Sequence, residues 1–416
     1  MQSGPESPLT RLAVPHPIVY TLLILPFGAT SGFVSVALTF LATRSGLTVA
    51  EGATLIAASI FPNMWKFFWA PVSDTTLSRK KWYVIANILC AVGMMAMAVI
   101  PLGPATLRLM WATIVLTSVA ATFLAFAVEA MMAHLTPHDH HGRVGGWFMA
   151  GNLGGSGLGG GLGLYLLGAL PDPWMTGGIL AILTLACCGA LIFVPDVPAE
   201  PSQGSPLVAM QNVGVDLWHV IRSREGMLCA ILCFVPIGTG SAAGVLTQAE
   251  VAAQWGATET HVGLIQGFLT GIVSMVGCLA AGPLCDRLGS RNAYALFGAL
   301  MAAVTAGMAV APYTPTMYVA FCLTYAFVTG LCYAAFTAFV LDAIGAGNAA
   351  TKYNGFASLS NTPIWYMGLV LAAAQVKWGA NGLLLTEAAF GILGIGVFAI
   401  AAYILRPMPV PQPVVT

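Results

Sequence analysis

The chain alternates long apolar stretches with short polar connections. A helix that crosses a lipid bilayer needs about 20 mainly apolar residues, and twelve stretches reach that length. They lie near residues 18–41, 50–71, 82–102, 106–134, 144–169, 174–194, 226–251, 258–283, 291–312, 315–341, 353–375 and 381–405. The pattern therefore predicts an all-α membrane protein with twelve transmembrane helices. We interpret the first stretch as a helix that is not cleaved.

Composition agrees with a lipid environment. The chain is 58% hydrophobic and only 7% charged, whereas soluble domains carry roughly 25% charged residues. Its net charge is zero, which does not favour nucleic-acid binding. The nine cysteines lack paired spacing, so they predict neither a disulfide scaffold nor a zinc site. We predict that the lipid bilayer surrounds the protein and that it has no cofactor, no metal and no enzymatic activity.

Lysine and arginine residues gather on one side of this topology, which predicts its orientation. With both termini inside, the cytoplasmic side holds Arg11, Arg79, Lys80, Lys81, Arg143, Arg222, Arg224, Arg287, Arg291, Lys352 and Arg406. The opposite side holds only Arg44, Arg108 and Lys377. The bias predicts a multi-pass protein of the cell (inner or plasma) membrane with both termini in the cytoplasm.

The sequence contains an internal repeat with an offset of about 210 residues. Four sequence features occur once in each part of the repeat. Pro26, Gly28 and Ser31 match Pro236, Gly238 and Ser241; Asp74 matches Asp286; Glu129 matches Asp342; and Asn152 matches Asn361. The repeat predicts two homologous six-helix halves, residues 1–194 and 226–416. A polar, proline-rich cytoplasmic linker, residues 195–225, is expected to join them.

Residues 282–291, Gly-Pro-Leu-Cys-Asp-Arg-Leu-Gly-Ser-Arg, resemble the GxxxDRxGxR signature of the major facilitator superfamily. Two parallel halves around a shared site in mid-membrane are the layout of that family. The resemblance implies the major facilitator fold. It also implies that Asp286, Arg287 and Arg291, with Asp74 in a degenerate first copy, hold the halves together and release them during transport. The alternative is a solvated loop whose charges only set topology.

A narrower resemblance lies in residues 61–71, Phe-Pro-Asn-Met-Trp-Lys-Phe-Phe-Trp-Ala-Pro. They look like the WKFxWAP signature of a branch that includes AmpG-like muropeptide permeases, acetyl-coenzyme A transporters and siderophore importers. Residues 349–360 are similar to the same branch's entry into its eleventh helix. Because these transporters carry different solutes, the resemblance implies the branch and not the substrate.

Charged residues inside predicted membrane helices are functional candidates, because a charge there costs a few kcal/mol or more. Lys66 and Glu129 lie at similar depth. We predict that they pair at a gate and that Glu129 binds a proton when the pair opens. A static pair, or a Lys66 side chain that reaches the interface, is the alternative. Asp342 lies nearer its helix end, where a contact between halves or a helix cap is expected, and Glu250 and Glu387 are weaker candidates.

The repeated PxGxxS motif is the main indication of a solute site. Proline removes a helix hydrogen bond and glycine allows close approach to the backbone, and matched interruptions in two halves indicate a mid-membrane site. Tolerated kinks are the alternative. The candidate binding residues are Pro26, Gly28, Ser31, Trp65, Trp69, Asn152, Pro236, Gly238, Ser241, Tyr325, Tyr333, Asn361 and Trp365.

Two further clusters are ambiguous. The fifth apolar stretch carries a glycine stripe that predicts close helix packing, with an antiporter motif as the alternative: Gly151, Gly155, Gly159 and Gly163. The connection before it carries four histidines, which we interpret as a solvated loop, with metal binding as the alternative: His134, His138, His140 and His141.

The sequence therefore predicts a secondary active transporter that works by alternating access, driven by protons, and is a monomer. Lys66 is the one cation predicted within a span, so polyanions such as coenzyme A thioesters are not expected as solutes. The aromatic and amide groups favour a bulky, neutral or weakly charged small organic solute. A non-transporting receptor or scaffold with the same fold, a proton antiporter that acts as an exporter, and a channel are the alternatives.

Overall fold

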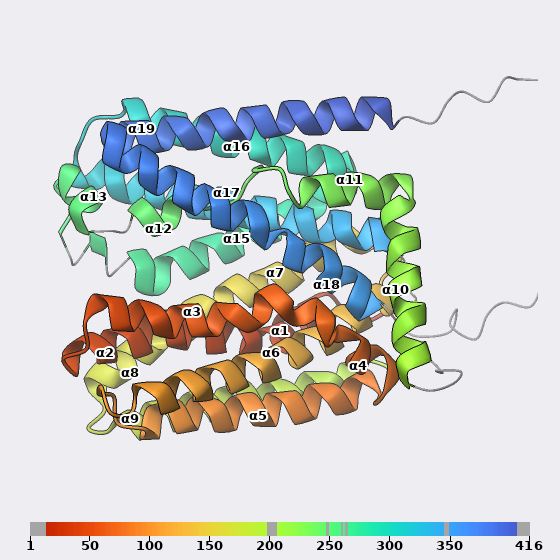
Figure 1. Ribbon diagram of the computed structural model, residues 1–416, viewed down its shortest axis with the longest axis horizontal. Helices are drawn as coiled ribbons and strands as arrows, with labels where there is room; N and C mark the ends of the chain where they lie inside the picture. The colour runs from red at the N-terminus through yellow and green to blue at the C-terminus, as the bar shows by residue number, and fades with distance from the viewer. Residues whose placement is uncertain are drawn as a thin grey trace, which may run out of the picture.

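The computed structural model describes residues 14–197, 206–246, 249–258, 261–262, 265–344 and 349–405. Most helices run along one direction, and α10 (Pro206–Arg222) lies across one end of the bundle (Figure 1). We call this the α10 end; the sequence predicts that it is cytoplasmic. Arg11, Arg406 and both chain ends fall outside the described residues, as does the Glu250 side chain, so the location of the termini stays a prediction.

The first half forms one side of the bundle, coloured red to yellow-green in Figure 1. Its elements are α1 (Ile18–Gly32), η2 (Phe33–Leu38), α2 (Thr39–Arg44), α3 (Val49–Trp65), η3 (Lys66–Phe68), α4 (Ala70–Thr75), α5 (Arg79–Val99), α6 (Leu107–Leu135), η4 (His138–His140), α7 (His141–Gly157), η5 (Leu158–Leu162), α8 (Gly163–Ala169), α9 (Pro173–Ala186) and η6 (Cys187–Phe193).

The second half forms the other side, coloured green to blue. Its elements are α11 (Arg224–Leu232), α12 (Ala242–Leu246), α13 (Ala249–Gln254), η7 (Ile265–Leu269), α15 (Thr270–Leu288), α16 (Ser290–Val310), α17 (Pro315–Ile344), α18 (Ala349–Leu359) and α19 (Asn361–Ile404).

Eight helical stretches of the described residues are long and apolar enough to cross a membrane. One of them, Ala349–Ile404, makes two passes, because α19 turns back at Gly379, whose φ is 69° (Figure 1). Three further passes, α3–α4, α7–α8 and α11–α13, are not among the eight stretches. Together they make the twelve passes that the apolar pattern predicts.

Glycine lets α1 and α7 approach each other closely. A Cβ atom at Gly28 would overlap the carbonyl of Asn152, and one at Gly32 would overlap the backbone of Ser156. On the α7 side, a Cβ atom at Gly151 would overlap the backbone of α1. The glycine stripe of the fifth apolar stretch therefore packs against α1, in the manner of small-residue interfaces between membrane helices.

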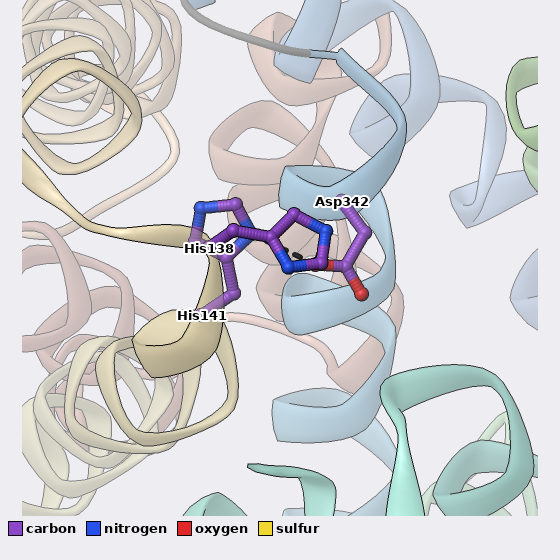
Figure 2. A group of neighbouring side chains, drawn as sticks. All are labelled: His138, His141 and Asp342. Atoms are coloured by element: carbon purple, nitrogen blue, oxygen red, sulfur yellow. Dashed lines mark hydrogen bonds and ion pairs between the residues drawn. The ribbon is translucent and has the colours of Figure 1, made fainter.

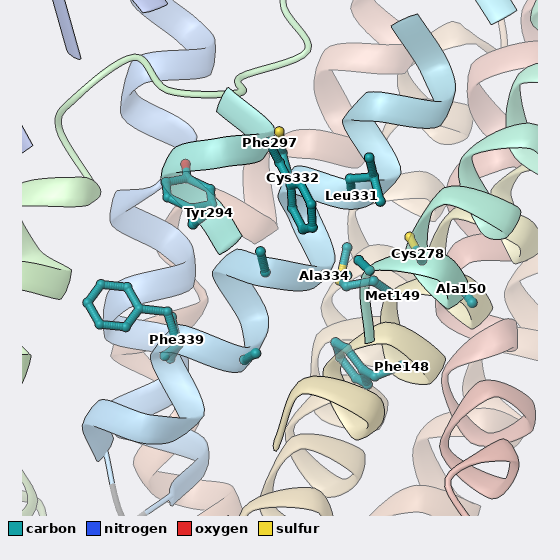
Figure 3. Close-up of a cluster of buried hydrophobic side chains, with 14 of the residues drawn as sticks. Phe148, Met149, Ala150, Cys278, Tyr294, Phe297, Leu331, Cys332, Ala334 and Phe339 are labelled. Carbon is teal, nitrogen blue, oxygen red and sulfur yellow. The ribbon is translucent and has the colours of Figure 1, made fainter. Parts of the chain in front are cut away.

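The two halves meet along α7 and α15. A Cβ atom at Gly146 of α7 would contact the backbone of α15 at Cys278 and Gly282. Figure 3 shows Phe148 and Met149 of α7 beside Cys278, near buried residues of α17. This interface is closely packed, so a relative movement of the halves must roll or slide these helices against each other.

The linker region differs from the loop that the sequence predicts. Residues 206–222 form α10, and proline at the first position of a helix is favourable because its missing N–H would have no helical partner. The helix is attached to the second half, where Asp216 lies 3.7 Å from the ammonium group of Lys352. The boundaries 195–225 of the linker stay a prediction, since residues 198–205 are outside the described part.

Candidate functional site

A cavity of about 490 Å³ lies between the two halves. Residues of α1, α3, α6 and α7 line one side, and residues of α16, α17, α18 and α19 line the other. Eight residues that the sequence predicts for binding or gating lie on its wall: Ser31, Lys66, Glu129, Asn152, Gly238, Tyr333, Asn361 and Trp365.

The other predicted binding residues lie elsewhere. Tyr325 lines a second cavity of about 350 Å³, which also lies between the halves. The indole N–H of Trp69 donates to the hydroxyl of Thr122 at 2.9 Å, and Trp65 stacks on Phe68. Pro26, Gly28, Pro236 and Ser241 are likewise outside both cavity walls. They shape or pack the helices beside the cavities.

Lys66 and Glu129 are both buried, and the Lys66 Nζ lies 3.9 Å from the Glu129 Oε1. Lys66 begins the short η3 turn that interrupts the second pass, and Glu129 lies on α6. The other oxygen of Glu129 accepts a hydrogen bond from the Asn354 amide, at 2.5 Å. Asn354 belongs to α18, so one carboxylate connects a cation of its own half with an amide of the other half.

Asp74 makes a second connection between the halves. Its Oδ1 lies 3.1 Å from Arg79, and its Oδ2 accepts hydrogen bonds from the Thr351 backbone N–H at 2.9 Å and the Thr351 hydroxyl at 2.7 Å. Thr351 lies in the first turn of α18, where the backbone N–H groups have no helical partners. The carboxylate therefore caps a helix of the second half and meets the positive end of its dipole.

Asp286 makes the matching connection from the second half. Its Oδ1 accepts a hydrogen bond from the Arg143 backbone N–H at 3.2 Å, and its Oδ2 lies 3.1 Å from the Arg143 side chain. Arg143 lies in the first turn of α7. The two acids of the repeat thus cap α18 and α7 in pseudo-symmetric fashion. Among the described residues, Arg287 and Arg291 form no ion pair.

Asp342 connects α17 to the start of α7 (Figure 2). Its Oδ1 lies 2.8 Å from the Nδ1 of His141, and the Ser290 hydroxyl donates to its Oδ2. The predicted position of Asp342 near its helix end agrees with this contact between halves. The sequence alone offered no sign that His141 would be its partner.

The seventh pass is unwound between α11 and α12. Gly238 and Gly240 have φ values of 59° and 72°, a conformation that glycine adopts readily and other residues avoid. Three backbone carbonyl groups beside or in the break each accept a hydrogen bond from a tyrosine hydroxyl, at 2.7 to 3.1 Å. Tyr366 donates to Phe234, Tyr294 to Ile237 and Tyr333 to Thr239. The repeated Pro-Gly signal anticipates this break, but not the tyrosines that complete it.

Glu387 adjoins the same break. It lies on α19, is 5% exposed, and its Oε1 accepts a hydrogen bond from the Tyr325 hydroxyl at 2.6 Å. The Tyr325 oxygen in turn accepts a hydrogen bond, at 3.1 Å, from the backbone N–H of Ala242, the first residue of α12. None of the ion pairs among the described residues includes Glu387. In the sequence, Glu387 is visible as an acid within an apolar stretch, but its tyrosine partner is not.

Comparison with known proteins decides the family. The family model described as "Major Facilitator Superfamily" matches residues 20–368. The chain belongs to the Major Facilitator Superfamily. It is therefore a multi-pass membrane transporter rather than an enzyme, and the predicted fold of twelve helices in two halves is confirmed.

Curated relatives of this chain include the anhydromuropeptide permeases of Escherichia coli strains K12 and O157:H7. Each is 25% identical over 255 residues, which cover 59% of this chain and 50% of the relative. The chain thus spans about half the length of the curated relatives it matches.

Two solved structures share the fold. The human organic anion transporter MFSD10 superposes with a TM-score of 0.69 at 16% identity, over 94% of this chain and 100% of that one. The Escherichia coli fucose:proton symporter FucP superposes with a TM-score of 0.71 at 14% identity, over 94% and 99%. At these identities the likeness shows the Major Facilitator Superfamily fold alone.

Proposed function

We propose that the protein is a proton-coupled secondary active transporter that moves a bulky, neutral or weakly charged organic solute by alternating access. The observation that carries the proposal is the cavity between the halves, whose wall contains the Lys66–Glu129 pair. Its volume of about 490 Å³ is in the usual range for small-molecule sites.

The chemistry of the wall favours the solute class. Aromatic and apolar side chains predominate, and the amides of Asn63, Asn152 and Asn361 can orient a polar solute by hydrogen bonds. Among the lining residues, Lys66 is the one lysine or arginine, and Glu129 already faces it. A solute with several phosphates needs several fixed cations, so we do not expect coenzyme A thioesters as solutes.

Glu129 is the proposed proton site. A proton on its carboxylate would remove the charge that holds Lys66 and would disturb the hydrogen bond from Asn354. Because Asn354 belongs to the other half, protonation would weaken a contact between the halves at the α10 end. The energy of proton entry would thereby favour one facing state over the other.

The relatives supply a first solute to test. An anhydromuropeptide is bulky and carries many hydrogen-bonding groups, and the curated relatives are permeases for this class. Because the chain spans about half of their length, this substrate is part of the proposal. The predicted boundaries of the two halves, the cytoplasmic location of the α10 end and the monomeric state belong to the proposal too.

The test measures uptake of a labelled anhydromuropeptide into proteoliposomes with and without an imposed proton gradient. Glu129→Gln should abolish gradient-driven uptake and spare solute exchange, because an amide cannot carry the proton. Glu51→Gln is the matched control, since Glu51 caps α3 at an exposed position and should leave both activities unchanged.

Each outcome has a distinct meaning. Gradient-driven uptake that persists in Glu129→Gln would remove this residue from coupling. Saturable uptake of acetyl-coenzyme A that is lost in Lys66→Ala would overturn the proposed solute class. A folded protein that shows neither uptake nor exchange of any solute in a broad panel would favour the receptor or scaffold alternative.

A further inference from the structure

Two imidazoles and one carboxylate converge at the α10 end, outside the cavity. The His141 Nδ1 and the His138 Nε2 lie 2.8 and 3.5 Å from the same Oδ1 atom of Asp342 (Figure 2). All three ligand atoms lie within 4.8 Å of one another. The histidines belong to η4 and α7 of the first half, and Asp342 belongs to α17 of the second.

The local backbone explains why the two rings face the same way. His138 begins a 3-10 turn that leads into α7 at His141. In such a turn, side chains three residues apart lie one above the other. Asp139 and His140 occupy the two positions between them, and these two side chains lie 3.3 Å from each other. The turn therefore brings His138 and His141, rather than their neighbours, to Asp342.

The spacing suits a tetrahedral zinc ion. With Zn–N and Zn–O bonds of about 2.0–2.2 Å, the ligand atoms of a tetrahedral site are about 3.3 Å apart. The distances of 2.8 and 3.5 Å to Asp342 lie on either side of that value. The His138 side chain is 81% exposed, so it can rotate to complete the geometry without displacing packed atoms.

The chemistry of the donors selects the kind of metal. Two imidazole nitrogens with one carboxylate favour Zn²⁺ and its transition-metal neighbours, whereas Mg²⁺ and Ca²⁺ prefer oxygen ligands. The Ser290 hydroxyl holds the second oxygen of Asp342 and so orients the carboxylate, as outer partners of metal ligands commonly do. Exposure of His138 gives an ion access from the solvent.

We propose that His138, His141 and Asp342 form a Zn²⁺ site that connects the first half of the transporter to the second at the α10 end. The ion would replace the direct His141–Asp342 contact with coordination bonds to both halves. It would therefore hold α7 and α17 at their present spacing. Binding does not depend on which solute the protein carries, so the site can be tested separately.

The experiment titrates Zn²⁺ into the purified full chain, without a histidine tag, by isothermal calorimetry. Binding of one Zn²⁺ per chain is expected, without competition from excess Mg²⁺. His138→Ala should weaken binding by at least about tenfold, and Ser290→Ala by about 10- to 100-fold, the usual effect of losing an outer partner. Co²⁺ should give the visible absorption of a tetrahedral site.

His140→Ala is the matched control. It removes a neighbouring histidine of the same turn that is also partly exposed, and it should leave the affinity for Zn²⁺ unchanged. Because the His138 and His140 side chains are both accessible, neither replacement disturbs buried packing. Equal affinity in His138→Ala and in the unchanged protein, or equal losses in both variants, would overturn the proposal.

Discussion

Glu129 and Glu387 are carboxylates buried within membrane-spanning helices, and their surroundings differ. Glu129 lies on the wall of the larger cavity, 3.9 Å from a lysine ammonium group. Glu387 lies outside that wall, where its carboxyl group accepts a hydrogen bond from the Tyr325 hydroxyl at 2.6 Å and also meets the Ala242 backbone N–H and the Thr239 hydroxyl. The positive charge of Lys66 compensates for the burial of Glu129. Glu387 instead has neutral hydrogen-bond donors beside a broken helix.

The difference indicates two ways of keeping an acid within a bilayer. A buried ion pair compensates for lost hydration only when both partners are present, so Glu129 and Lys66 depend on each other. Without a cation, an ionised Glu387 would be expensive, and we expect it to carry a proton in this conformation. Glu129 is then the acid that can change partners, and Glu387 is the acid that stabilises the unwound segment.

The largest expected effect tests the charge pair. Lys66→Met leaves Glu129 without its cation and should destabilise the protein by about 3–5 kcal/mol, the usual result of breaking a buried pair. The double variant Lys66→Met/Glu129→Gln should recover most of that loss, because no charge is left buried. Unfolding in mixed micelles measures both.

The loss of stability in Glu387→Gln is to be compared with the loss in Lys66→Met. It exchanges a neutral acid for a neutral amide that can still accept from Tyr325, so its cost should be within about 1 kcal/mol. If it destabilises the protein as much as Lys66→Met does, then Glu387 is charged in this conformation and the comparison fails.

A smaller loss of stability is expected when the hydroxyl that donates a hydrogen bond to Glu387 is removed. Tyr325→Phe leaves both the Glu387 carboxyl and the Ala242 N–H without this partner, which should cost about 2 kcal/mol. Tyr333→Phe removes one hydroxyl from the Thr239 carbonyl alone and should cost about 1 kcal/mol. Equal losses in the two variants would show that Tyr325 has no special role beside Glu387.

A further effect of modest size is expected at the backbone of the break. Gly238→Ala puts a side chain at a φ of 59° and 2.5 Å from the Cys332 Sγ, so it should cost at least about 1–2 kcal/mol. Gly244→Ala, in helical α12 with open space around it, is the control and should cost nothing or stabilise slightly. A harmless Gly238→Ala would mean that the segment also adopts a conformation without a left-handed residue.

The same motif has different outcomes in the two halves. The first copy, from Pro26 to Ser31, stays within α1, whereas the second, from Pro236 to Ser241, is unwound. Gly28 is needed for contact with the Asn152 backbone, and Gly238 for its left-handed conformation. The local sequence permits a break in both copies, and only the neighbouring tyrosines of the second half stabilise one.

The sequence by itself determined the properties that depend on local hydropathy and on repetition. Twelve apolar stretches, the two-half repeat, the family signature and the common depth of Lys66 and Glu129 can all be seen along the chain. The stretches and the depth of the charged residues can be read because lipid imposes the same length and the same penalty for charge on every helix. The repeat and the signature can be read because they are patterns of residues along the chain.

Only the tertiary structure decided which faces of the helices meet. Hydropathy is nearly uniform around a membrane helix, so it does not reveal how the helix is rotated. Packing therefore determined that Glu387 faces inward, that Asn354 joins Glu129, and that Asp342 meets a histidine 201 residues away. These contacts depend on close approach between helices that the chain order does not place together.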